Sequence, residues 1–354
     1  RSGAAQEGGG GVQEEEGGAA GVEVPTGEPA SEQTGLLEQT ETSGQSETPE
    51  PTDISAQQEN SAEEGSIQQE AAGEETLEEQ ISGYVEAMTL EEKVAGLFII
   101  TPEQLTGVGT AVQAGESTRE ALEQYPVGGL VYFAKNIQSE QQLKEMLANT
   151  ASYSRYPLFL GVDEEGGQVA RVAKTLGLEN VGPMAEIGAS GDVNAAYAAG
   201  AAIASYLKEY GFNLDFAPVA DVLTNPDNTV IGDRSFGSDP ALVSQMVAAA
   251  VRGFQENGVN ACIKHFPGHG DTAGDSHDGQ VETDRTLEEM QAAEFLPFTA
   301  GIEAGVNMVM VGHISAPGLT DGDKVPASMN EKIITDVLRK QLGYNGIVIT
   351  DAMD

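Results

Sequence analysis

Short apolar runs alternate with longer amphipathic stretches from about residue 76 to the last residue. Each run is rich in β-branched or aromatic residues and is bounded by glycine, proline or polar residues. This pattern is typical of strands that are buried on both faces of a parallel sheet. We therefore predict seven strands, within residues 94–100, 128–133, 157–163, 212–221, 261–268, 307–313 and 346–351.

The stretches between these runs follow the helical period. In residues 241–257 the apolar side chains fall on one stripe, Asp239 can cap the N-terminus and Gly258 can end the helix. Residues 192–210 and 330–342 show the same pattern. We predict a helix over each of the three ranges.

Strand and helix alternating over about 280 residues predict a parallel α/β fold. A TIM (β/α)8-type barrel needs about 250 residues, and a doubly wound open sheet is the alternative. Polar residues stand at the ends of five runs: Asp163, Asp221, Lys264–His265, His313 and Asp351. Barrel enzymes place their catalytic residues where several strands end, so we favour the barrel. No GxGxxG motif follows the first run, and with seven strands we expect a barrel truncated before its eighth strand.

The N-terminal part of the chain has a different texture. No aromatic residue precedes Tyr84, and glycine, glutamate, glutamine, serine, threonine and proline dominate. Such a segment cannot bury enough apolar surface to offset its ordering entropy. We expect residues 1–76 to be a disordered acidic tether and 77–354 a barrel domain. The tether is either a solvated tail or a spacer at a cell surface, which favours a secreted or lipid-anchored protein over a cytoplasmic one.

The net charge of −40 excludes several classes of partner. With 57 acidic and 17 basic residues, the chain repels nucleic acid and anionic membranes. A single cysteine, Cys262, excludes an internal disulfide, and no apolar run is long enough for a transmembrane segment. We expect a monomer.

Residues 264–279, KHFPGHGDTAGDSHDG, hold three of the four histidines. His265 and His269 stand four apart as in zinc-binding helices, but Phe-Pro-Gly between them breaks a helix. A loop site built from Asp271, Asp275 and His277 lacks the strong ligand spacings. We therefore expect no metal site here.

The Asp275-Ser276-His277 sequence favours proton transfer. Two residues apart on an extended loop, the carboxylate and the imidazole can lie on the same side. The carboxylate would then fix the tautomer of the ring and raise its pKa, which suits acid/base work near neutral pH. The alternative is that the loop histidines satisfy buried carbonyl groups.

Five further residues are candidates for binding a polyhydroxyl substrate. Asp163 and Arg171 could grip hydroxyl groups or form a surface ion pair. Arg234 lies in a long glycine-containing loop, where a structural turn is the alternative. Lys264 and His265 could donate hydrogen bonds to hydroxyls or serve as buried structural donors.

Asp351 follows the last apolar run, within VITDAMD. A carboxylate at the end of a buried strand is either a nucleophile or the N-cap of the next element.

Five blocks in chain order resemble the N-terminal barrel of glycoside hydrolase family 3, and within it the bacterial β-N-acetylglucosaminidases. They are MTLEEKVAGLF, GVDEEGGQVARV, DFAPVADVLTNPDNTVIGDRSFGSDP, KHFPGHGDTAGDSHDG and GIVITDAMD, from about residue 80 to the end. The resemblance implies that Asp351 is the nucleophile, His277 the general acid/base and Asp275 its partner. It implies that the sugar hydroxyls are held by Asp163, Arg171, Arg234, Lys264 and His265.

The function implied by this resemblance is a retaining β-N-acetylglucosaminidase. It would remove terminal β-linked N-acetylglucosamine from peptidoglycan fragments by double displacement, with no cofactor or metal. Two alternatives remain open: a β-glucosidase or xylosidase of the same family, and a non-catalytic module that binds peptidoglycan.

Overall fold

The computed structural model describes residues 76–274 and 281–353. The chain divides into two units, Arg1–Ala72 and Gly73–Asp354, and every described residue belongs to the second. The expected tether therefore lies outside the described residues, except for Thr76. The Thr76 side chain caps α1 (Leu77–Ala87) in a reciprocal capping box with Glu79.

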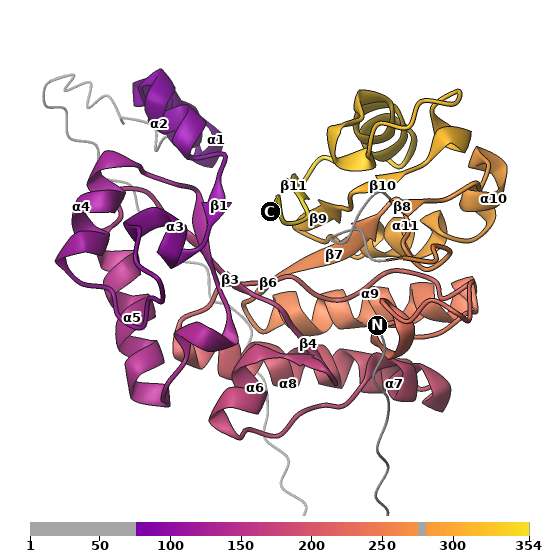
Figure 1. Ribbon diagram of the computed structural model, residues 1–354, viewed down its shortest axis with the longest axis horizontal. Coiled ribbons are helices and arrows are strands. Elements are labelled where there is room, and N and C mark those ends of the chain that lie inside the picture. Colours follow the sequence, from indigo (N-terminus) through magenta and orange to yellow (C-terminus); the bar gives the residue numbers. More distant parts are fainter. Residues whose placement is uncertain (1–75, 275–280, 354) are drawn as a thin grey trace, which may run out of the picture. The chain divides into compact units, whose positions relative to one another are not determined.

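Seven parallel strands form one sheet whose spatial order is the order of the chain. Each strand pairs with the strand that precedes it in this sheet, as in a (β/α) barrel, and the sheet is curled with helices outside it (Figure 1). The predicted barrel-type α/β fold is therefore confirmed. The strands are β1 (Ile99–Ile100), β2 (Gly129–Tyr132), β3 (Phe159–Val162), β6 (Leu214–Asp215), β7 (Asn260–Phe266), β9 (Met308–Val311) and β11 (Ile347–Thr350).

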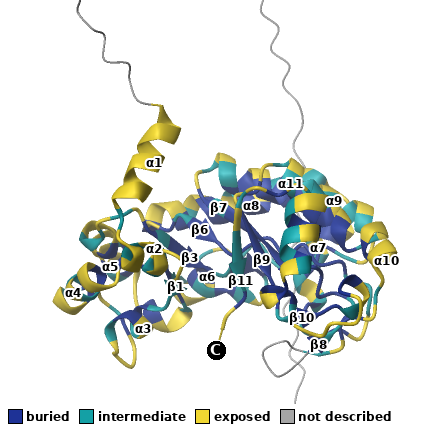
Figure 2. Ribbon diagram, turned by 90° about the horizontal axis from the view of Figure 1, so that it is seen from above, coloured by how far each residue is buried: buried dark blue, intermediate teal, exposed yellow. Residues whose placement is uncertain are grey.

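The outer layer consists of the helices that connect these strands. α9 (Pro240–Glu256) packs between α8 (Val193–Tyr210) and α11 (Phe295–Glu303). Figure 2 shows buried strands under these helices, whereas α1 is exposed along its length. The remaining elements are α2 (Leu90–Ala95), α3 (Pro102–Thr106), α4 (Glu116–Gln124), η1 (Ala134–Asn136), α5 (Glu140–Tyr153), β4 (Glu164–Gly166), β5 (Val169–Ala170), α6 (Arg171–Leu176), α7 (Met184–Ser190), η2 (Gly232–Arg234), β8 (Val281–Glu282), α10 (Leu287–Ala292), β10 (Ile314–Ser315), η3 (Pro317–Leu319), η4 (Ala327–Met329) and η5 (Lys332–Gln341).

The two faces of the sheet enter two separate apolar layers, because successive side chains on a strand point to opposite faces. Leu160 and Val162 of β3 join the large core between sheet and helices, whereas Phe159 joins the second layer. All seven strands contribute to this second layer, which we call the interior layer. Its members are Ile99, Val131, Phe159, Leu214, Phe216, Cys262, Met308, Met310 and Ile349.

The three predicted helices form close to the expected bounds. Asp239 caps α9 by accepting a hydrogen bond from the amide of Ala241 at 2.9 Å, as predicted. The third helix differs in type, because η5 is a π-helix rather than an α-helix. It still buries the predicted apolar residues Ile333, Val337 and Leu338.

Two predicted strands are wrong over much of their length. In residues 94–100 only β1 is extended. Val94 and Ala95 belong to α2, which Thr89 and Glu92 begin with a capping box. Residues 96–98 form the turn between α2 and β1. In residues 212–221 only β6 is a strand, since Pro218 has no amide hydrogen to donate to a ladder. Beyond Pro218 a single bridge joins Val219 to Lys264.

Within residues 76–274 and 281–353, no helix combines the length and apolarity that a bilayer crossing requires.

Candidate active site

Three predicted site residues share one face of the sheet, at the carboxyl ends of β3, β7 and β11. A side chain at Gly161 would meet the Phe216 ring at 3.0 Å, so this position faces the interior layer. Asp163 stands two residues further along, as Lys264 does beyond Cys262 and Asp351 beyond Ile349. Because strand side chains alternate with a period of two, the charged residues lie directly beyond the interior layer.

The pKa of the Cys262 thiol is affected by all three charged residues, Asp163, Lys264 and Asp351. Burial raises its pKa, Lys264 opposes the shift, and the carboxylates of Asp163 and Asp351 add to it. Both acids therefore lie within electrostatic range of the same buried sulfur atom, although they are 188 residues apart in the chain (351 − 163).

Lys264 joins the first acid to a second one that the sequence analysis missed. The Nζ atom of Lys264 lies 2.7 Å from Oδ1 of Asp163 and 2.6 Å from Oε1 of Glu165. Glu165 belongs to the β4–β5 hairpin that directly follows β3, and only 3% of its surface is exposed. The signal for it was present, since Asp163 and Glu165 are two residues apart.

Arg234, at the end of η2, completes this charge cluster. Its Nε and Nη2 atoms donate to the two carboxylate oxygens of Glu165 at 2.8 and 2.9 Å, and Nη1 donates to the carbonyl of Val230. Burial would raise the pKa of Glu165, but Lys264 and Arg234 outweigh it and lower the pKa to about 2. The carboxylate is therefore ionised at any physiological pH, and together with Asp163 it balances the two cations.

His265 is also brought to this edge of the sheet, where Asp221 binds it. Nδ1 of His265 lies 2.7 Å from Oδ2 of Asp221, while Oδ1 accepts the backbone amides of His265 and His269 at 3.2 and 2.7 Å. The Lys264–His265 peptide bond is cis. Asp221 is fully buried, so its carboxylate serves the residues around it rather than solvent.

Arg171 is not joined to Asp163 by an ion pair within the described part of the chain. It begins α6, and its buried Nε has no hydrogen-bond partner among the described residues. The nearby Glu164 accepts from the amides of Val172 and Ala173, at 2.7 and 2.9 Å, and so caps this helix. A sugar-binding role for Arg171 stays a prediction.

Asp351 directly follows β11 and is 8% exposed. Its backbone amide donates to the carbonyl of Val311 on β9 at 2.9 Å, and Oδ1 accepts from the amide of Ala352 at 2.8 Å. The first bond fixes the backbone of Asp351 against β9, and the second orients its carboxylate.

Asp275 and His277 lie outside the described residues. The residues on either side of them are close together, because a side chain at Gly274 would lie 3.8 Å from Val281. Nearby, Arg285 links two acidic residues. Its Nε atom lies 3.2 Å from a carboxylate oxygen of Asp271 and 3.2 Å from one of the buried Glu294. β8, which begins at Val281, pairs with β10 just beyond β9.

No cluster of three or more histidine, cysteine, aspartate or glutamate side chains in the described ranges is arranged to hold a metal ion.

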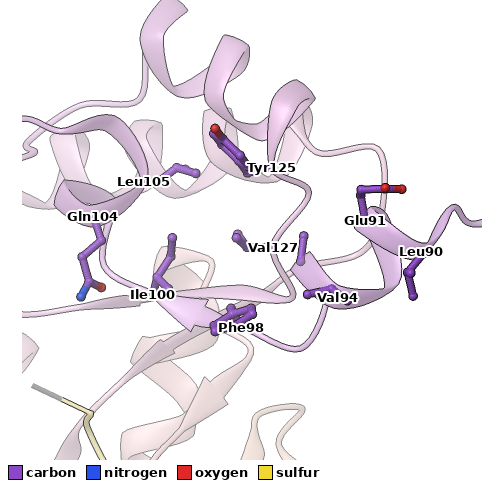
Figure 3. Close-up of a pocket in the computed structure, with 10 residues that line it drawn as sticks. Leu90, Glu91, Val94, Phe98, Ile100, Gln104, Leu105, Tyr125 and Val127 are labelled. Atoms are coloured by element: carbon purple, nitrogen blue, oxygen red, sulfur yellow. The ribbon is translucent and has the colours of Figure 1, made fainter.

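A separate apolar pocket of about 620 Å³ lies between α2, β1, α3 and α4. In Figure 3 the side chains of Val94, Phe98, Ile100 and Val127 surround it, with Gln104 and Glu91 at its sides. None of the predicted site residues lines it, and it lacks the convergent polar groups that a sugar site needs.

Comparison with known families decides the relationship of this chain. The model of the glycosyl hydrolase family 3 N-terminal domain matches residues 89–354. The chain belongs to glycosyl hydrolase family 3. The family 3 match covers every residue placed in the site above.

Among similar proteins, "Beta-hexosaminidase A" of Pseudoalteromonas piscicida is 39% identical over 255 residues, covering 66% of this chain and 42% of that protein. A family 3 β-N-acetylglucosaminidase from Paenibacillus sp. str. FPU-7 superposes with a TM-score of 0.68 at 37% identity, covering 75% of this chain and 50% of that one. NagZ from Neisseria gonorrhoeae, in complex with N-trifluoroacetyl-D-glucosamine, gives a TM-score of 0.65 at 31% identity and coverages of 72% and 74%. The chain thus spans half or less of the first two relatives.

Proposed function

We propose that this protein is a retaining β-N-acetylglucosaminidase that removes terminal β-linked N-acetylglucosamine. The observation that carries the proposal is the convergence of Asp163, Lys264 and Asp351 on one face of the sheet, beyond the interior layer. Relatives that are named β-hexosaminidase or β-N-acetylglucosaminidase support the same reaction.

Binding is assigned to the charge cluster. A sugar hydroxyl both donates and accepts hydrogen bonds, and the cluster offers both kinds of partner. Asp163 retains 21% side-chain exposure, so its carboxylate can accept from a hydroxyl while Lys264 holds it in place. Arg234 supplies further donors, and Glu165 neutralises it without needing to touch the substrate.

The chemistry is assigned to Asp351, His277 and Asp275. The Asp351 carboxylate attacks the anomeric carbon and forms a glycosyl ester as the bond to the leaving oxygen breaks. His277, protonated beside Asp275, gives its proton to that oxygen. In the second half, neutral His277 takes a proton from water, whose oxygen attacks the anomeric carbon and releases Asp351. No cofactor takes part in either step.

We further propose that the substrate comes from peptidoglycan fragments. The support is the likeness to NagZ, which binds an N-acylated glucosamine. Hydrolysis of soluble muropeptides, followed by mass spectrometry, would show loss of one N-acetylhexosamine. Cleavage of chitin oligosaccharides but not of muropeptides would replace this substrate class with another.

The acidic residues 1–76 support a location outside the cytoplasm, because a charged polar segment can act as a spacer at a surface. Protease treatment of intact cells should remove the protein if this is right. A protein that only lysis exposes would be cytoplasmic.

The proposed reaction is tested with paired substrates. We expect turnover of an aryl β-N-acetylglucosaminide well above that of the matching aryl β-glucoside or β-xyloside. Preference for either of the latter would assign the alternative family activity. Sugar binding with no turnover of any of them would indicate a non-catalytic module.

The role of His277 has its own test. His277→Ala should slow hydrolysis of substrates with poor leaving groups far more than of activated aryl substrates, since a good leaving group needs little protonation. Equal losses would contradict the acid role.

A further inference from the structure

The three described histidines differ in what their ring nitrogens face. For His265, Nδ1 lies 2.7 Å from Oδ2 of Asp221. A carboxylate accepts hydrogen bonds and does not donate them. Nδ1 of His265 must therefore carry the proton, and a neutral ring then has a bare Nε2.

Within the described part of the chain, the second ring nitrogen of His265 has no protein partner. Nε2 makes no hydrogen bond to any residue in the described ranges, and His265 keeps 6% of its surface exposed. It directly follows Lys264, whose Nζ contacts Asp163 in the site. A ring nitrogen that no described protein group uses, beside a polar cluster, can accept a hydrogen bond from a ligand or from water.

We propose that Asp221 is a positioning residue that holds His265 in the Nδ1–H tautomer, so that Nε2 accepts a hydrogen bond from a hydroxyl of the bound sugar. This inference rests on the proposed function, since it names a contact of the same site. The sequence leaves two donor roles open for His265, to a sugar hydroxyl or to a buried structural partner. The contact of Nδ1 with Asp221 fits the second role, and the proposal adds an accepting role for Nε2. Sugar hydroxyls would then meet two acceptors, Asp163 and His265, beside the cationic donors.

Asp221 is built for this task. Its other oxygen accepts the backbone amides of His265 and His269, so the carboxylate is fixed to the segment that carries the ring. The side chain is fully buried, which leaves it no water to exchange for the imidazole. A carboxylate held in this way determines which ring nitrogen is protonated.

The other two described histidines provide internal references. Nε2 of His313 lies 2.7 Å from the carbonyl oxygen of Ala352, which only accepts, so His313 should be the opposite, Nε2–H tautomer. Nδ1 of His269 faces the hydroxyl of Thr272, which can donate or accept, so its tautomer is not fixed by this contact.

The direct test is a two-bond ¹H–¹⁵N correlation spectrum of the histidine rings in the whole protein. It would be recorded at about pH 8, above the ordinary imidazole pKa of about 6.5. His265→Gln and His313→Gln variants assign the two signals. We expect Nδ1–H for His265 and Nε2–H for His313. An Nε2–H or doubly protonated His265 would overturn the proposal, and this measurement needs no activity.

The functional test separates an accepting ring from a donating one. Each sugar hydroxyl is replaced in turn by hydrogen or by fluorine, which accepts weakly but cannot donate. For the hydroxyl that contacts His265, both replacements should lower kcat/KM equally, on the order of tenfold. A fluoro substrate that clearly outperforms its deoxy counterpart at every position would show a donor at Nε2 and contradict the proposal.

The variant Asp221→Asn extends the test. The amide can donate to Nδ1, so the ring should change to Nε2–H, and KM should rise about tenfold with a smaller change in kcat. Thr272→Val is the matched control, because it removes the partner of the neighbouring His269 ring and should leave the His265 signal and KM unchanged. An unchanged His265 tautomer in folded Asp221→Asn protein would sink the inference.

Failure of the proposed function gives a different result. If the wild-type protein hydrolyses no glycoside, the proposed reaction is wrong, whatever tautomer the spectrum shows for His265. If the enzyme is active but the His265 ring is protonated at Nε2, the proposed reaction stands and only the proposed role of Asp221 is wrong.

Discussion

The same strands that build the interior layer also build the candidate site, and only two residues separate them. On β7, Cys262 lies in an apolar layer and Lys264 contacts two carboxylates. On β11, Ile349 packs in the layer and Asp351 follows it. The sheet therefore holds the charged groups on a rigid apolar base, which is how a site gains accurate geometry.

The two regions also differ in what stabilises them. The interior layer contains no charge and depends on packing. The charge cluster within the site pairs two carboxylates, Asp163 and Glu165, with two cations, Lys264 and Arg234, so the formal charges of these four residues cancel. Removing one member of a buried ion pair in the site should therefore lower the free energy of unfolding more than removing a methylene group from the interior layer.

The largest expected effect is on catalysis at Asp351. Asp351→Asn keeps the size of the side chain and its acceptor for the Ala352 amide, but it removes the nucleophile. We expect kcat to fall roughly 10⁴-fold, with a melting temperature close to that of the wild type. Activity within tenfold of the wild type would show that the nucleophile is another group.

The next effect concerns the charge balance of the site. Glu165→Gln leaves Lys264 and Arg234 without their shared counter-charge, and we expect unfolding to become easier by about 3–5 kcal/mol in urea titrations. Glu92→Gln is the matched control, because its partner Arg155 is exposed and glutamine keeps the capping box. Similar losses in both variants would contradict a special role for the buried cluster.

The pH dependence of the Glu165 effect has a definite sign. Because the folded pKa of about 2 lies below the ordinary 4.5, ionised Glu165 stabilises the fold above pH 4.5. This contribution is lost as the pH falls through the folded pKa. The stability gap between wild type and Glu165→Gln should be constant above pH 4.5 and shrink toward pH 2. A gap that widens on acidification would refute the assignment.

A smaller effect is expected in the interior layer. Met308→Ala leaves a cavity below the site, which should cost about 3 kcal/mol of stability. KM should stay unchanged, since no polar group moves. Met329→Ala is the control, because that side chain is 67% exposed. A changed KM with unchanged stability would mean that the layer touches substrate.

The smallest effect is expected in the apolar pocket of Figure 3. Val94→Thr changes a half-exposed wall of that pocket. We expect a stability change within about 0.5 kcal/mol and no change in kcat/KM. A clear loss of activity would link the pocket to the reaction.

Short apolar runs predicted the seven strands and their chain order, because strands buried on both faces of a parallel sheet are almost continuously apolar. Their bounds were less predictable. Val94 and Ala95 are the last residues of a helix that a capping box at Thr89 and Glu92 begins, and β6 ends at Asp215, ahead of Pro218. Both errors arose where local backbone chemistry, rather than hydrophobicity, decided the structure.

Only the site residues that stand at the ends of predicted strands could be found from the sequence. Asp163, Lys264 and Asp351 were found because each follows an apolar run. Glu165 and the carboxylate of Asp221 act on other side chains, and such pairings arise from three-dimensional contact between distant segments. Spacing along the chain places Glu165 two residues after Asp163 and Asp221 at the end of an apolar run, but it does not show which side chains they bind.

The most direct test of the proposed reaction is covalent trapping with a slow fluorinated N-acetylglucosamine substrate, followed by peptide mass spectrometry. We predict one sugar residue attached to the peptide that contains Asp351, and none in Asp351→Asn. A sugar attached to another carboxylate, or turnover with inversion at the anomeric carbon, would contradict the account.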